Sequence, residues 1–206
     1  MRISASEGFG SWFLARHLPG FARQHPGLTI DLVASSGFLR PSKREADLAI
    51  MLSRPKAGPV IARKLSDYAL RLYAARDWLD RAGAPRGIAD LAKRPADIIG
   101  YVPDLLYAPE LAYLSDLRPG LTARLRSSSI IGQYSLLRAG GGIGVLPCFI
   151  GDSSEDLRPV LPEWRITRSF WLVMHRDTHG LARIRAAREW LIDCVHTHRA
   201  LLLPAG

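Results

Sequence analysis

The segment from Arg165 to the end of this 206-residue chain constrains its fold more than any other. Residues 165–177 are dense in aromatic and β-branched side chains, which is typical of a strand. Apolar residues then recur at helical spacing between Leu181 and Val195, with arginines on the other faces. This strand and helix come last in the chain and have no lobe of their own. We therefore expect them to pack back onto the elements at the beginning of the chain.

Strand and helix patterns alternate through the rest of the chain and restart once, near residue 98. Such βαβ alternation predicts parallel strands with right-handed crossovers. We expect an α/β fold with two βαβ lobes of the periplasmic-binding-protein-like type, joined by two crossover strands, with a ligand cleft between the lobes. The first lobe would comprise residues 1–70 and 169–206, and the inserted second lobe residues 71–168. Within them we expect strands over residues 2–6, 28–35, 47–51, 60–65, 69–75, 98–102, 122–128, 143–146 and 165–177. We expect helices over residues 9–21, 77–82, 130–139 and 181–195, and a short turn over residues 88–91.

The composition narrows the possible classes of protein. An apolar content of 48% is sufficient for a buried core, and neither a bilayer-spanning run nor a basic and apolar leader is visible, so we expect a cytoplasmic protein without a membrane partner. The two cysteines, Cys148 and Cys194, fit free thiols in a reducing compartment. The net charge of +9 is spread along the chain rather than gathered in a basic block, which argues against direct DNA binding by these residues.

Serine-bearing junctions follow several predicted strands, where an α/β fold places its ligands. At such a junction the free N–H groups of a helix start and a serine hydroxyl can hold a polar group, although the same serine can simply cap the helix or make a local turn. Gly100 and Tyr101 would add backbone access and an aromatic wall. The candidate ligand contacts at strand ends are Ser6, Glu7, Gly8, Phe9, Ser35, Ser36, Gly100, Tyr101, Ser129 and Ile130.

Several motifs together closely resemble the effector-binding domain of LysR-type transcriptional regulators. They are the opening strand at residues 2–6, the Asp47–Ile50 strand, the glycine-rich return from Gly140 to Pro147, and the closing strand and helix. The resemblance implies a small organic effector held between the lobes, with Pro147 near the cleft. It also implies a homodimer, a tetramer for the full-length protein, and DNA binding only through an amino-terminal winged helix-turn-helix, which we expect to be absent from this chain.

Two residues depart from the family pattern. Met51 stands where an arginine commonly follows the Asp47–Ile50 strand, and Glu7 would repel an anionic effector unless it points away.

The alternative is a solute-binding protein of a transport system, which shares the fold. We expect no enzyme activity because acid, base and nucleophile do not assemble, and His175-Arg176-Asp177 reads as a strand end. We expect neither a cofactor nor a metal site, since the pair His196 and His198 is typical of an exposed helix end.

Overall fold

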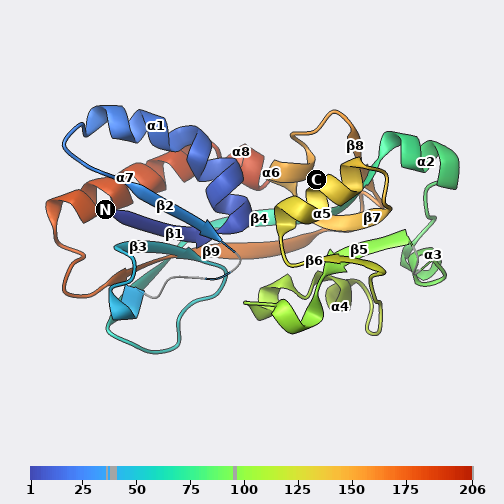
Figure 1. The fold of residues 1–206 in the computed structure, drawn as a ribbon, viewed down its shortest axis with the longest axis horizontal. Helices are drawn as coiled ribbons and strands as arrows, with labels where there is room; N and C mark the ends of the chain where they lie inside the picture. The colour runs from blue at the N-terminus through green and yellow to red at the C-terminus, as the bar shows by residue number, and fades with distance from the viewer. Residues whose placement is uncertain (36, 38–40, 95–96, 206) are drawn as a thin grey trace. The chain divides into compact units, whose positions relative to one another are not determined.

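The structure is a computed structural model that describes residues 1–35, 37, 41–94 and 97–205 (Figure 1). The chain divides into two compact units. Unit 1 contains Met1–Tyr68 and Ser169–Leu203, and unit 2 contains Ala69–Arg168 together with the last residues from Pro204. The closing strand and helix thus belong with the beginning of the chain. The first unit boundary falls after Tyr68, whereas the sequence predicts it after residue 70. The last residues of the chain contact unit 2, because the carbonyl of Ala205 accepts a hydrogen bond from the Arg71 guanidinium at 3.2 Å.

Unit 1 is a mixed sheet with helices against it. Strand β1 pairs in parallel with β2 and β3, while β3 pairs antiparallel with β9, so the closing strand reverses the direction of the predicted parallel sheet. Because β1 has a parallel neighbour on each side, its residues after Arg2 are all buried. The strands are β1 (Arg2–Ser6), β2 (Asp31–Ser35), β3 (Leu48–Met51), the first part of β4 (Val60–Ala75) and most of β9 (Ile166–His175), since both of these strands continue into unit 2. The helices are η1 (Phe9–Leu14), α1 (Ala15–Gln24), η2 (Pro41–Lys43), α7 (Ala182–Thr197) and α8 (Arg199–Leu202).

The first helix and the closing helix lie side by side on the same face of the unit 1 strands (Figure 1). Phe21 of α1 stacks on Trp190 of α7, with ring centroids 4.8 Å apart. On the sheet side, the ring of Phe170 lies between those of Phe9 and Tyr68, at centroid distances of 4.4 and 4.1 Å. These aromatic contacts join the two ends of unit 1 in one core.

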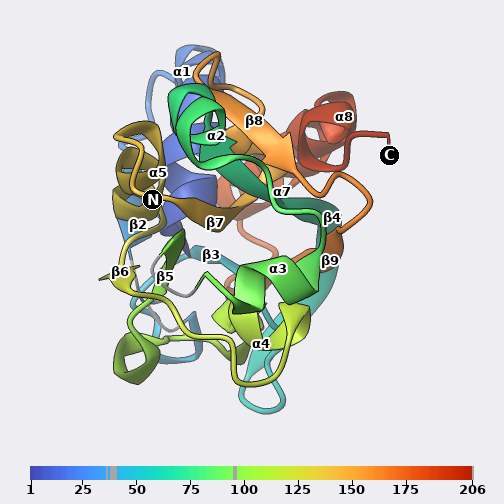
Figure 2. The same ribbon diagram turned by 90° about the vertical axis from the view of Figure 1, so that its right-hand side faces the viewer.

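The sheet of unit 2 is built on three parallel strands, β5, β6 and β7. Strand β5 pairs in parallel with β6 and β7, and the second half of β4 pairs antiparallel with β7 and β8. Helices α5 and α6 lie on one side of these strands and α4 on the other (Figures 1 and 2). The elements are β5 (Ile98–Tyr101), β6 (Leu125–Ser127), β7 (Ile143–Pro147), β8 (Leu157–Val160), α2 (Arg76–Ala82), α3 (Ile88–Ala92), η4 (Pro103–Leu105), η5 (Pro109–Leu111), α4 (Tyr113–Leu117), α5 (Ile130–Arg138) and α6 (Cys148–Gly151).

Three sequence expectations on these elements were wrong. The strands expected over residues 60–65 and 69–75 are one continuous strand, β4, because the polar interruption at Ser66-Asp67 is satisfied within the sheet. The strand expected over residues 122–128 extends only from Leu125 to Ser127. The sequence did not predict helix α6 or strand β8, and the turn expected over residues 88–91 is the short helix α3. None of the helices in the described part of the chain combines the length and apolar character that a bilayer-spanning helix requires.

Candidate functional site

Two of the predicted serines end neighbouring strands of unit 1. Ser6 is the last residue of β1 and Ser35 the last of β2, and the parallel register places them directly opposite each other. Ser6 is 5% exposed, while the Ser35 hydroxyl donates to the carbonyl of Gly37 at 2.7 Å, which makes a local turn. The next candidate, Ser36, lies outside the described residues. We call this pair, Ser6 and Ser35, the unit 1 edge.

The residues after Ser6 begin the first helix. Gly8 is the residue before η1 and supplies no side-chain cap, and Glu7 is half-buried. The side chain of Phe9 is 1% exposed, and its ring packs against Phe13 at 5.0 Å as well as against Phe170. The Phe9 ring is therefore part of the core. An effector contact at residues 7–9 stays a prediction, and it would involve backbone groups of these residues.

Unit 2 has a comparable edge at the carboxyl ends of its parallel strands. Tyr101, the last residue of β5, lies opposite Ser127, the last residue of β6, and Pro147 ends β7, the other parallel neighbour of β5. We call these three residues the unit 2 edge. Gly100 has a packing role, since a Cβ atom there would lie 2.9 Å from Leu114 and 3.1 Å from Ala123.

Ser129 caps the helix that follows this edge. Its hydroxyl oxygen accepts the backbone N–H of Gly132 at 2.9 Å, and its own N–H donates to the Ser127 hydroxyl at 3.1 Å. Gly132 has no room for a side chain, because a Cβ atom would lie 2.4 Å from the Ser127 oxygen. Ile130 is 4% exposed and packs inward. The capping alternative for Ser129 is therefore realised, and an effector contact of its hydroxyl stays a prediction.

A small apolar cavity within unit 2 adjoins the predicted aromatic wall. It measures about 130 Å³ and is lined by Tyr101 and Tyr113, whose rings meet edge to face at 5.9 Å, and by Arg126, whose Nε donates to the carbonyl of Ala123 at 2.8 Å. The cavity is smaller than typical sites for drug-sized ligands, which measure about 300–1,000 Å³.

The sequence did not predict a second, charged cavity in unit 2. It measures about 500 Å³ and lies between the start of α2 and the end of α5. Arg138 pairs there with Asp156, and the Nη2 to Oδ2 distance is 2.5 Å. Arg81 and Asp77 also line it. The residues that line this cavity are far apart in the sequence. Each charged residue on a helix is read from periodicity only as part of a solvated face, so the sequence does not indicate that they come together.

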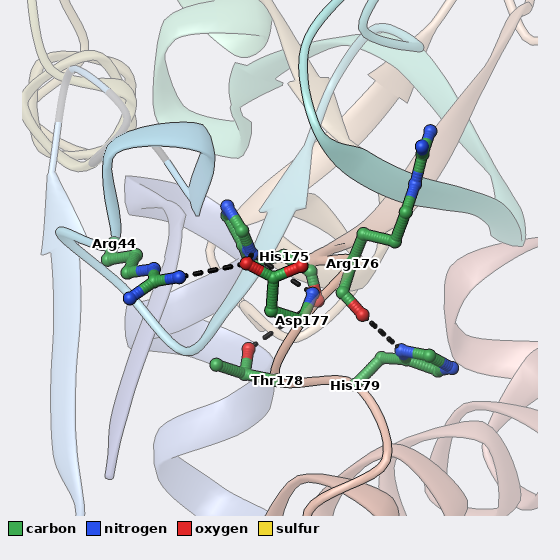
Figure 3. A network of polar contacts seen from close by, with 6 residues as sticks. All are labelled: Arg44, His175, Arg176, Asp177, Thr178 and His179. Atoms are coloured by element: carbon green, nitrogen blue, oxygen red, sulfur yellow. Dashed lines mark hydrogen bonds and ion pairs between the residues drawn. The ribbon is translucent and has the colours of Figure 1, made fainter.

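Strand β9 ends at His175, and Arg176 and Asp177 lie in the turn that follows it, two residues short of the strand end that the sequence predicted (Figure 3). The Nδ1 atom of His175 accepts the backbone N–H of Asp177 at 3.1 Å, and the Asp177 carboxylate pairs with Arg44 at 2.9 Å. The side chains of Arg44 and Asp177 are both 64% exposed. His175 is buried, so its hydrogen bond orders the turn after the strand.

The two cysteines are buried free thiols. Burial raises the pKa of Cys148, although a hydrogen bond with the Tyr73 hydroxyl acts in the opposite direction. The Tyr73 hydroxyl donates to Asp152 Oδ1 at 2.7 Å, and burial together with these neighbours raises the pKa of Tyr73. Burial also raises the pKa of Cys194 to about 11. Thiols with a raised pKa are poorly reactive, because the thiolate is the nucleophile.

One group of metal-ligating side chains is brought together in unit 1 by α1 and the end of α7. One ligand atom from each of His17, Cys194 and His198 lies within 4.8 Å of the other two. Burial, the His198 ring and the nearby Arg16 cation lower the pKa of His17, which favours its neutral form. His196, the other half of the sequence pair, is exposed and outside this group.

Comparison with known proteins identifies relatives over nearly the whole chain. The sequence profile of the LysR substrate binding domain matches residues 1–194. The Mau operon transcriptional activator of Paracoccus denitrificans is 26% identical over 195 residues, which cover 93% of this chain and 64% of that protein. The HTH-type transcriptional regulator PtxR of Pseudomonas aeruginosa is 27% identical over 201 residues, which cover 93% of this chain and 62% of that protein. The chain thus spans less than two thirds of these relatives, which are transcription regulators rather than transport proteins.

Solved structures share the fold. The regulatory domain of CrgA from Neisseria meningitidis matches with a TM-score of 0.81 at 23% identity, covering 94% of this chain and 97% of that one. The effector domain of AmpR from Pseudomonas aeruginosa matches with a TM-score of 0.75 at 17% identity, covering 96% of both chains. Both matches show that the fold is shared over nearly the whole of each chain. The profile match over residues 1–194 shows that this chain belongs to the LysR substrate binding domain family.

Proposed function

We propose that this chain is the effector-sensing part of a transcription regulator. A small organic effector binds to the unit 1 edge and the unit 2 edge together, and its binding changes how a longer, DNA-binding protein assembles on its target. The observation that carries the proposal is the placement of polar groups at strand ends in each unit, with Ser6 opposite Ser35 in one and Tyr101 opposite Ser127 in the other. The family of the chain supports the same function.

The chemistry of the two edges limits the effector. Serine hydroxyls and the free N–H groups of a helix start bind oxygen and nitrogen acceptors, and an aromatic wall binds a flat apolar group. A ligand can shift the equilibrium between an open and a closed arrangement of the lobes only if it binds the closed arrangement more tightly than the open one. We therefore infer a small metabolite with one polar end, whose contacts to both units favour one arrangement of the dimer or tetramer.

Effector binding is tested by thermal-shift screening of the whole chain against aromatic acids, amino acids and small metabolites. A ligand that binds the folded state raises the melting temperature by mass action. Its affinity is then measured by calorimetry for Ser6→Ala and Ser129→Ala. We expect each to weaken binding by roughly tenfold, which corresponds to about 1.4 kcal/mol. Equal affinities in wild type and both variants would contradict effector binding at Ser6 of the unit 1 edge and at Ser129, the cap of the helix that follows the unit 2 edge.

A matched control separates ligand contact from helix stability. Ser135 is exposed on α5, and its hydroxyl donates to the Ile131 carbonyl at 3.1 Å, remote from the strand ends. Ser135→Ala should leave the affinity unchanged. Coupling to assembly is measured by sedimentation of the full-length protein with and without the identified compound. An unchanged sedimentation profile and unchanged DNA affinity would refute the regulatory half of the proposal while leaving the binding result intact.

A further inference from the structure

A cluster of two imidazoles and one thiol lies between α1 and the end of α7, within unit 1 and independent of the proposed effector edges. His17 comes from α1, Cys194 from the last turn of α7, and His198 is the residue that caps the end of α7. The His17 and His198 rings are 4.1 Å apart at their centroids and inclined by 41°. The Cys194 Sγ atom lies beside the His198 ring, 4.0 Å from its Nδ1. Three potential ligand residues from two segments that are distant in sequence thus lie together, with one ligand atom of each within 4.8 Å of the other two.

The spacing within α7 explains why two of these groups face the same way. Cys194 and His198 are four residues apart, and side chains at this separation lie on one face of a helix. Paired metal ligands on helices use the same i, i+4 spacing. His17 completes the group because α1 packs alongside α7, where the Phe13 ring holds the His17 ring at a centroid distance of 4.8 Å.

The hydrogen bonds prepare His198 for coordination. Its Nδ1 lies 2.8 Å from the carbonyl oxygen of Cys194, so Nδ1 carries the proton and donates it. The neutral ring then has its lone pair on Nε2. Metal-binding histidines commonly donate the other ring N–H to a backbone carbonyl in this way, which fixes both the tautomer and the ring orientation.

The distances require only a small adjustment for a metal ion. Zinc binds histidine nitrogen at about 2.0–2.1 Å and cysteine sulfur at about 2.3 Å, which places tetrahedral donor atoms about 3.3–3.6 Å apart. The three donors here lie within 4.8 Å of one another. Side-chain rotations that bring them together by about 1 Å would complete the geometry. His17 and His198 are half-buried, which leaves them room for such rotations.

We propose that His17, Cys194 and His198 form a Zn²⁺ site with three protein ligands and an open fourth position. One thiolate with two imidazoles is a donor set for zinc and not for magnesium or calcium, which require oxygen ligands. The three side chains line a cavity of about 580 Å³, which gives a metal ion and its water access from outside. The carboxylates of Asp193 and Glu189 line the same cavity and attract a cation. The bound ion would link α1 to α7.

The competing interpretation is an aromatic cluster in which Phe13 and two imidazoles pack without any ligand. Calorimetry of the untagged whole chain with Zn²⁺ distinguishes the two. We expect one ion per chain in the wild type, and affinity at least roughly tenfold weaker in His17→Gln and in His198→Gln. His196→Gln is the matched control, because His196 is exposed on the same helix and outside the cluster. Equal affinities in all four proteins would overturn the proposal.

Cobalt provides a readout specific for the thiolate. Co²⁺ bound to the proposed site should show a thiolate-to-cobalt charge-transfer band in the near ultraviolet. The band should disappear in Cys194→Ser and persist in Cys148→Ser, whose thiol is buried in unit 2. Its absence from the wild type, or its persistence in Cys194→Ser, would refute the site. If Cys194→Ser is unfolded by circular dichroism, loss of the band in folded His17→Gln decides the question in the same way.

Discussion

The Ser169 hydroxyl donates to Asp67 Oδ1 at 2.6 Å and so joins β9 to β4 within unit 1. The second carboxylate oxygen of Asp67 accepts from Lys64 Nζ at 2.9 Å. A carboxylate with these two donors is satisfied in the middle of a strand. This relationship explains why β4 continues through Ser66 and Asp67, where the sequence indicates an interruption.

Replacing Ser169 by alanine removes the hydroxyl donor and leaves the carboxylate with the Lys64 contact. Hydrogen bonds to charged groups contribute about 1.5–3 kcal/mol, and water replaces part of this at a partly exposed group. We expect Ser169→Ala to lower the free energy of unfolding by about 1–2 kcal/mol in urea titrations. Ser135→Ala, on the exposed face of α5, should change it by less than about 0.5 kcal/mol.

The acid limb of stability should depend on Asp67. Burial raises the pKa of Asp67, but the hydrogen bonds from Lys64 and Ser169 outweigh this effect and hold the pKa below its ordinary value of 3.8. A depressed carboxyl pKa contributes stability that is present above the unfolded-state pKa and is lost as pH falls through the folded-state pKa.

Asp67→Asn should therefore be less stable than wild type at about pH 7, and this difference should shrink as the pH falls below about 4. Urea unfolding of both proteins across this range measures it. Asp177→Asn is a suitable control, because the Asp177 ion pair with Arg44 is exposed and such pairs contribute about 0–1 kcal/mol. A difference between Asp67→Asn and wild type that stays constant down to about pH 2 would contradict the assignment.

The fold was predictable from the sequence where packing into a core requires a regular pattern of apolar residues. The closing strand and helix end unit 1 as expected, because an aromatic strand and an apolar helix stripe both need a core, and that core is provided by Phe9 and Tyr68. The π-helical start at Phe9–Leu14 was not predictable, since apolar periodicity does not distinguish i→i+5 from i→i+4 hydrogen bonds over a single turn.

The candidate sites were predicted unevenly for a physical reason. Strand ends in a parallel sheet follow from the order of elements, so the register of Ser6 with Ser35 agrees with the sequence argument. The grouping of His17 with Cys194 and His198 depends on how α1 packs on α7, which no local pattern encodes. In the sequence, only the i, i+4 spacing of Cys194 and His198 indicates this group.

The Cys148 thiol should be unreactive in the folded protein. Burial raises its pKa above the ordinary value of 9.0, so the thiolate fraction near neutral pH is very small. We expect the Cys148 peptide to remain unmodified by iodoacetamide at about pH 8 in the native chain and to be modified rapidly in urea, as measured by mass spectrometry. Rapid native modification would show that the thiol is accessible and activated.

Stability linked to this thiol should be lost on the alkaline side. A raised thiol pKa contributes stability that is fully present below the unfolded-state pKa of about 9 and is lost as pH rises through the folded-state value. Cys148→Ala removes this titration, so its stability should fall less steeply than that of wild type above about pH 9. Identical slopes for the two proteins would contradict the prediction.

Gly10 of the first helix lies against Ala34 of β2 without room for a methyl group. A Cβ atom at Gly10 would be 2.5 Å from the Ala34 Cβ and 3.3 Å from that of Ala5, both in buried or half-buried strands. Gly10→Ala should therefore push the helix from the sheet and destabilise unit 1 by about 1–3 kcal/mol.

Gly20 in α1 has as its nearest neighbour only the Arg23 guanidinium, at 3.9 Å. Gly20→Ala should instead stabilise the chain by about 0.5–1 kcal/mol through helix propensity. Urea unfolding of the two variants measures both signs, and a stabilising Gly10→Ala would contradict the close packing of this helix on β2.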